Sequence, residues 1–139
     1  MVLKAAATYF AIVFGVGFLL GPMRVLWLEP RLGKTLAVLC ETPFLLSAMI
    51  VAARWLAKRL GLIGDRRSLA VMGIVALLFQ QLADFALGIA LRGITPAEQL
   101  AAFATPAGFV YAAALIAFAV MPLLVNRRSA NHAAARARD

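Results

Sequence analysis

The chain has 139 residues, of which 64% are hydrophobic and 14% are charged, and its mean hydropathy is +0.92. Soluble domains are roughly half apolar, so this composition excludes a soluble globular protein and indicates one that is dissolved in lipid. Fourteen basic residues against six acidic ones give a net charge of +8. Because the basic residues lie between and after apolar runs, the charge indicates membrane topology and no nucleic-acid partner is predicted.

The first apolar run, Ala5–Met23, holds 19 uncharged residues between Lys4 and Arg24. A helix needs about 20 residues to cross the hydrocarbon core of a bilayer. The run is also longer than the apolar core of a typical cleavable signal, so we expect a retained first span. Pro22, which follows Gly21, is expected to end or kink this span.

Three further runs are long enough to cross a bilayer, and they predict the fold class. They are Thr35–Ala53, Ser68–Leu91 and Gln99–Asn126. Backbone amides in lipid must be satisfied within their own segment, and the connections between the runs are short. We therefore expect an all-α integral membrane protein, an antiparallel bundle of four transmembrane helices over residues 1–126. Residues 127–139 are expected to form a flexible, basic cytoplasmic tail. Pro43 is expected to kink the second helix or to restart it.

Two threonine–proline pairs divide the region before the fourth span. Thr95-Pro96-Ala97-Glu98 is typical of a capping box with proline at the first helical position. Thr105-Pro106 repeats the threonine–proline start ten residues later. The sequence therefore predicts a short outer-surface helix, followed by a fourth span from Pro106 to about Asn126.

The distribution of basic residues predicts the orientation, because short loops rich in lysine and arginine stay on the cytoplasmic side. Ten basic residues fall on one predicted side: Lys4, Arg54, Lys58, Arg59, Arg66, Arg67, Arg127, Arg128, Arg136 and Arg138. The other side has four, Arg24, Arg31, Lys34 and Arg92. Both termini are therefore expected in the cytoplasm of a bacterial inner membrane. The four tail arginines are expected to attract anionic lipid headgroups: Arg127, Arg128, Arg136 and Arg138.

Two acidic residues, Glu41 and Asp84, lie inside predicted spans. A charge near the centre of a span costs at least about 2.5–3.5 kcal/mol on insertion scales, so both residues need partners. At 100° per residue, Gln80 and Asp84 share a stripe with small residues that should face other helices. We expect a buried polar cluster of Arg24, Glu41, Gln80 and Asp84, in which Arg24 meets both acids. One arginine cannot neutralise two carboxylates, so one acid becomes a candidate proton site.

The loop after the first span carries Glu29, Arg31 and Lys34. We interpret them as interfacial charges, with a partner-docking surface as the alternative. The run RVLWLEPRLG at residues 24–33, followed by Glu41-Thr42-Pro43, resembles uncharacterised small four-span bacterial inner-membrane proteins. The resemblance covers mainly the first half of the chain and implies no activity.

No catalytic, cofactor or metal site is predicted. The single histidine, His132, lies in the tail, so the spans offer no histidine to a haem or metal, and Cys40 has no histidine base near it in the sequence. We expect a non-enzymatic accessory or structural module, as a homo-oligomer or within a larger membrane complex, whose polar cluster sets helix packing. The alternatives are a minimal proton-coupled transporter or channel using Glu41 or Asp84, and an intramembrane enzyme, for which no nucleophile–base pair is visible.

Overall fold

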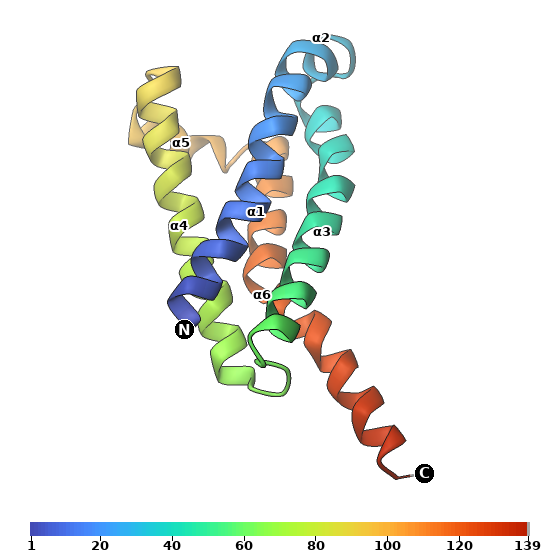
Figure 1. Cartoon of the computed structure of the whole chain (residues 1–139). Coiled ribbons are helices and arrows are strands. Elements are labelled where there is room, and N and C mark those ends of the chain that lie inside the picture. Colours follow the sequence, from blue (N-terminus) through green and yellow to red (C-terminus); the bar gives the residue numbers. More distant parts are fainter. Residues whose placement is uncertain (139) are drawn as a thin grey trace.

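The computed structural model describes residues 1–138, with all of their side chains except those at 128–130 and 133. Over this range the chain is helical and contains no strand (Figure 1). Four helices are long and apolar enough to cross a membrane. The prediction of an all-helical chain with four such segments is confirmed.

The helices follow one another with short connections. They are α1 (Val2–Met23), the π-helical turn η1 (Arg24–Leu28), α2 (Glu29–Leu32), α3 (Lys34–Arg59), α4 (Arg66–Arg92), α5 (Pro96–Ala102) and α6 (Pro106–Arg136). The short helix before the last span and the helix start at Pro106 are confirmed. The structure answers the question about Pro43, because α3 continues through this residue without restarting. Helix α6 extends beyond the expected end of the fourth span near Asn126, because the chain stays helical as far as Arg136. Much of the expected tail is therefore a continuation of this helix.

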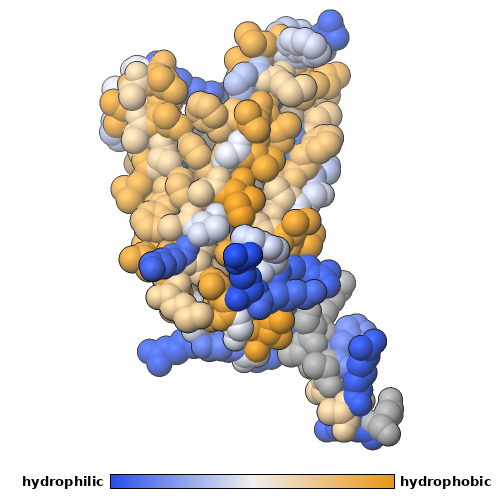
Figure 2. Space-filling model, in the orientation of Figure 1, coloured by the Kyte–Doolittle hydropathy of each residue, from blue (hydrophilic) through white to orange (hydrophobic). Residues whose placement is uncertain are grey.

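Each long helix packs against two others. Helix α1 lies against α3 and α4, and α6 lies against the same two helices from the other side. We call the end that holds the N-terminus and the α3–α4 loop the basic end, since most basic residues gather there (Figure 2). The opposite end, which holds α2 and α5, is called the cavity end (Figure 1).

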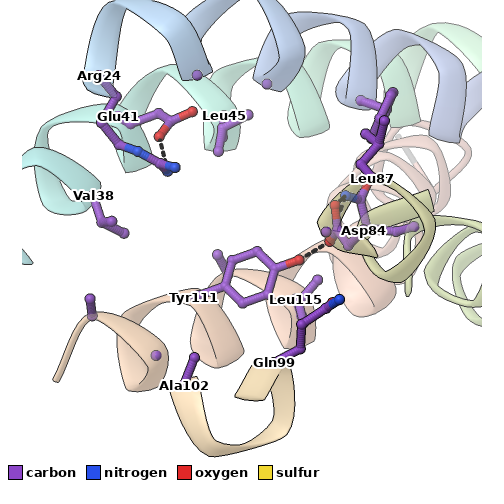
Figure 3. A pocket seen from close by; sticks show the side chains of 18 of the residues that line it. Arg24, Val38, Glu41, Leu45, Asp84, Leu87, Gln99, Ala102, Tyr111 and Leu115 are labelled. Carbon is purple, nitrogen blue, oxygen red and sulfur yellow. Dashed lines mark hydrogen bonds and ion pairs between the residues drawn. The ribbon is translucent and has the colours of Figure 1, made fainter. Parts of the chain in front are cut away.

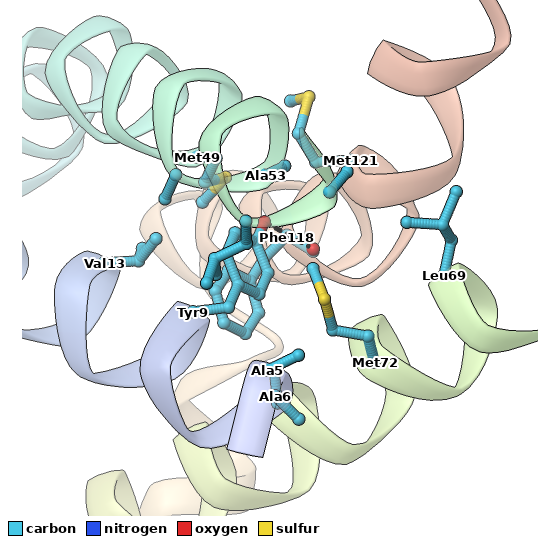
Figure 4. Close-up of a cluster of buried hydrophobic side chains, with 14 of the residues drawn as sticks. Ala5, Ala6, Tyr9, Val13, Met49, Ala53, Leu69, Met72, Phe118 and Met121 are labelled. Atoms are coloured by element: carbon cyan, nitrogen blue, oxygen red, sulfur yellow. Dashed lines mark hydrogen bonds between the residues drawn. The ribbon is translucent and has the colours of Figure 1, made fainter. Parts of the chain in front are cut away.

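The hydrophobic core (Figure 4) combines residues from the first half of α1, the second half of α3 and the first part of α4, so it lies toward the basic end. At its centre Tyr9 of α1 stacks on Phe118 of α6 with ring centroids 4.6 Å apart, and its hydroxyl donates to the Phe118 carbonyl at 2.9 Å. Small residues let the helices approach around this pair: Ala5, Ala6, Ala53, Ala57 and Ala76 are all fully buried. The helices are therefore held tightly at one end.

Helices α4 and α6 approach each other closely at Gly73. A Cβ atom added at Gly73 would lie only 1.9 Å from the carbonyl oxygen of Ala119. A side chain at this position would collide with backbone, so glycine is what allows the two helices to touch. At the cavity end α4 leans away from α1 and α3 (Figure 1).

The outer sides of the helices are apolar (Figure 2). Large side chains such as Leu19, Leu82 and Ile116 are more than half exposed, at 74%, 68% and 65%. At the basic end of α3, the Arg59 guanidinium lies 5.2 Å from the centre of the Trp55 ring. Such a surface is typical of helices that face lipid.

Candidate functional site

A cavity of about 560 Å³ lies between the helices at the cavity end (Figure 3). Its walls come from the four long helices, from α5 and from the α5–α6 connection. Most of the lining is apolar and much of it aromatic, including Phe14, Phe18, Leu45, Phe85, Phe103 and Leu115. The cavity exists because the residues that draw the helices together lie at the other end of the molecule.

One polar group in the cavity joins η1 to α3. The Nη1 atom of Arg24 donates to Oε2 of Glu41 at 2.7 Å. Glu41 is 7% exposed, so this ion pair is largely removed from solvent. The Nε atom of Arg24 lies 3.5 Å from Oε1 of Glu29 without hydrogen-bond geometry. Arg24 is therefore neutralised by acids on its own side of the cavity.

A π-helical turn follows Pro22 and begins at Arg24. Proline has no backbone N–H, so the regular hydrogen bond to the carbonyl four residues earlier is missing there. The chain then takes a wider turn over Arg24–Leu28. Turns of this kind insert an extra residue and shift the direction of the side chains that follow them, and they are frequent at functional sites.

A second polar group joins α4 to α6 on the opposite side of the cavity (Figure 3). Gln80 Nε2 lies 3.0 and 3.1 Å from the two carboxylate oxygens of Asp84, and the Tyr111 hydroxyl donates to Oδ2 of the same carboxylate. All three side chains are partly buried. Both donors are neutral, and within the described part of the chain no cation forms an ion pair with Asp84.

All four residues of the predicted polar cluster line this cavity, but as two separate groups. Arg24 pairs with Glu41, whereas Gln80 bonds to Asp84 within one helix. The expected contact of Arg24 with both acids is not present. The carboxylate of Asp84 on α4 instead accepts a hydrogen bond from the hydroxyl of Tyr111 on α6.

Tyr111 was not anticipated from the sequence. It lies within an otherwise apolar span, where an aromatic residue is read first as a packing side chain. The available signal was its hydroxyl, because a tyrosine inside a span needs a partner for that group.

The three loop residues proposed as a partner surface occupy different places. Glu29 is partly buried and turns toward Arg24. Arg31 is exposed on α2, and Lys34 is exposed where α3 begins and borders the cavity. Lys34 thus belongs to the mouth of the cavity, and the structure does not join the three into one patch of charge.

Helix α5 packs against α4 at this mouth. Thr95 and Glu98 form the predicted capping box, with the Thr95 N–H donating to Glu98 Oε2 at 2.7 Å and the Glu98 N–H donating to Thr95 Oγ1 at 3.2 Å. Gln99 Nε2 donates to the Phe85 carbonyl at 3.3 Å. A Cβ atom at Gly88 would lie 2.3 Å from Gln99 Nε2, so the glycine makes room for this side chain.

The charges around the cavity do not cancel evenly. Arg24 and Glu41 neutralise each other, which leaves Asp84 inside and the exposed Lys34 and Arg92 at the mouth. Arg92 lies eight residues beyond Asp84 on α4, or about 12 Å along the helix axis. Asp84 is therefore the charge in the interior that has no opposite charge in contact with it.

Comparisons with protein-family models, with curated proteins and with solved structures find no match to this chain. The chemistry of the site therefore has to come from its own residues. Within the described residues, no three side chains of the metal-binding types lie together, and Cys40 is a free, exposed cysteine on α3. What the site offers is a partly open apolar volume with a small number of polar groups.

Proposed function

We propose that the chain is an integral protein of a bacterial inner membrane, an antiparallel bundle of four transmembrane helices with both termini in the cytoplasm. The apolar outer surface supports insertion, and the basic residues gathered at one end support the orientation. Among the tail arginines proposed to meet anionic headgroups, Arg127, Arg136 and Arg138 are exposed, and the side chain of Arg128 lies outside the described residues.

Reporter fusions test this orientation. Green fluorescent protein fused after Arg138 should fluoresce in a bacterial host, and alkaline phosphatase fused at the same point should be inactive. Alkaline phosphatase inserted in the loop after Arg92 should be active. The reverse pattern would refute the proposed topology.

We further propose that the protein is a non-enzymatic module that binds a small molecule in the cavity between its helices. The observation that carries this proposal is Asp84, a carboxylate that forms no ion pair with any described residue and lies in an apolar cavity of about 560 Å³. Ligand sites commonly measure about 300–1,000 Å³ and combine apolar walls with few polar groups. An ionisable residue within a span is costly, which makes a functional role its first explanation.

The arrangement of the polar groups favours binding over a role in helix packing alone. Arg24 and Glu41 connect η1 with α3, and Asp84 and Tyr111 connect α4 with α6. Among the described residues, no polar contact crosses the cavity between these pairs. Packing across the molecule comes instead from Tyr9 and the other residues of the core at the basic end.

A second candidate is a proton-coupled transporter that uses the same carboxylate. Its support is that Asp84 is neutralised either by a proton or by an external cation, since its contacts within the described chain are neutral. In proteoliposomes, a proton gradient should drive ligand uptake that Asp84→Asn abolishes while the variant still folds. Binding without uptake would leave the protein as a binding module.

Filling the cavity tests the binding proposal. Gly21 lines the cavity, and a Cβ atom there meets nothing within 4 Å, so Gly21→Leu should fold and occupy the space. Gly15 has the same free space but does not line the cavity, which makes Gly15→Leu the matched control. The probes are tetraphenylphosphonium and tetraphenylborate, two hydrophobic ions of similar size and opposite charge.

The measurement is equilibrium dialysis of each probe against the protein in nanodiscs, with empty nanodiscs as the background. At least one probe should show saturable binding, which Gly21→Leu removes and Gly15→Leu retains. Absence of saturable binding for both probes, or equal loss in the two glycine variants, would overturn the proposed function.

A further inference from the structure

We infer that the ligand of this cavity is a hydrophobic organic cation, whose charge pairs with Asp84 and whose apolar body lies among the aromatic side chains. The inference rests on the proposed ligand-binding function and names the class of molecule that the same site would take. Its basis is the placement of one uncompensated carboxylate within an apolar, aromatic volume.

The hydrogen bonds around Asp84 suit its charged form. Gln80 and Tyr111 both donate, and the carboxylate oxygens accept all of the contacts. These donors fix the direction of the carboxylate but bring no positive charge. A carboxylate held in this way in an apolar space is stabilised by a counter-ion, and a cationic ligand supplies it.

The basic residues that border the cavity do not supply this counter-ion. Arg24 is engaged by Glu41 at 2.7 Å on the opposite wall. Lys34 and Arg92 are exposed to solvent at the mouth. Arg92 is about 12 Å along α4 from Asp84, and among the described residues no ion pair joins the two side chains. The interior of the cavity is therefore negative although its rim is positive.

The walls favour an organic cation over a metal ion. Calcium requires six or more oxygen ligands, whereas this part of the cavity offers the carboxylate of Asp84 with the oxygens of Gln80 and Tyr111. The remaining lining is rich in aromatic rings: Phe14, Phe18, Phe85 and Phe103. Ring faces attract cations that have little hydration shell, which is a property of bulky organic ammonium and phosphonium ions.

Tyr111 connects the two parts of the proposed site. Its hydroxyl holds the Asp84 carboxylate, and its ring lies 5.7 Å from that of Phe103, centre to centre. Phe103 follows α5, so the aromatic wall is continuous from the carboxylate to the helix at the mouth. A cation bound at Asp84 would thus contact rings on the side of α6 as well as on α1.

The test compares the two tetraphenyl ions on Asp84→Asn and on a carboxylate control outside the cavity, Asp65→Asn. Wild-type protein should bind tetraphenylphosphonium at least about tenfold more tightly than tetraphenylborate, because one buried charge favours one sign of ligand. Asp84→Asn should weaken binding of the cation by at least about tenfold and leave binding of the anion unchanged or stronger. Asp65→Asn should behave as the wild type.

Each outcome has a distinct meaning. Preference for tetraphenylborate would refute the cationic class and assign the exposed basic rim as the recognition element, while the binding proposal would stand. Saturable binding of neither ion would overturn both proposals. Asp84→Glu keeps the charge and should keep the preference for the cation, so it serves as the decisive variant if Asp84→Asn does not fold. Equal weakening of cation binding in folded Asp84→Asn and Asp65→Asn proteins would also refute the role of Asp84.

Discussion

Substituting Gly73 by alanine should destabilise the protein by pushing α4 away from α6. The added Cβ would lie 1.9 Å from the Ala119 carbonyl oxygen, and restoring even a 3.0 Å contact requires the helices to separate by about 1 Å. The obstacle is backbone, which has no alternative rotamer to adopt. Overpacking of a core costs about 1–3 kcal/mol, and we expect the upper part of this range.

Alanine also has an intrinsic advantage over glycine of roughly 0.5–1 kcal/mol within a helix, so the net loss in unfolding free energy should be about 2 kcal/mol. Gly15→Ala is the control, because a Cβ atom there meets nothing within 4 Å and should not destabilise the fold. Unfolding can be measured by SDS titration in mixed micelles followed by pulse proteolysis. A Gly73→Ala protein as stable as Gly15→Ala would show that the two helices do not touch at this point.

Three further predictions concern the ion pair and the helix caps. Glu41→Ala should destabilise the fold by up to about 3 kcal/mol, since it leaves Arg24 without its main partner. In a double-mutant cycle, combining Glu41→Ala with Arg24→Leu should recover part of this loss. Full additivity of the two substitutions would contradict the pairing. Thr95→Ala should cost about 1 kcal/mol and increase amide hydrogen exchange in α5 but not in α3; unchanged exchange in α5 would argue against the cap. Hydrogen bonds from the side chain and the backbone N–H of Ser68 hold the pKa of Asp65 in the folded protein below its ordinary value of 3.8. The charged Asp65 cap therefore stabilises the protein above pH 3.8, and this stabilisation is lost as the pH falls through the lowered pKa of the folded state. Melting curves from pH 7 to pH 2 should therefore show a larger acid-induced loss for the wild type than for Asp65→Asn, and equal losses would refute it.

The fold could be predicted where local chemistry decides the structure. The lengths of the apolar runs set the four long helices, and the Thr95 capping box and Pro106 mark helix starts that the structure confirms. These signals act within a few residues, so no knowledge of tertiary packing is needed to interpret them.

The candidate site was only partly predictable, for two physical reasons. Arg24 lines the cavity together with Gly17 and Gly21, as the helical spacing predicts, but spacing along one helix does not show which acid on another helix the arginine will reach. The contact between Asp84 and Tyr111 depends on how closely α4 approaches α6, which is set by the backbone contact at Gly73 farther along the helix. A cavity is also a place where side chains fail to meet, and sequence periodicity contains no direct signal for it.

The continuous helix from Pro106 to Arg136 has a practical consequence for studying this protein. A helical reporter domain joined in phase at Arg136 would share the backbone hydrogen bonding of the last span and so take a defined orientation relative to it. Such a rigid fiducial would give a 14.9 kDa membrane protein enough ordered mass outside the micelle for image alignment in electron cryo-microscopy.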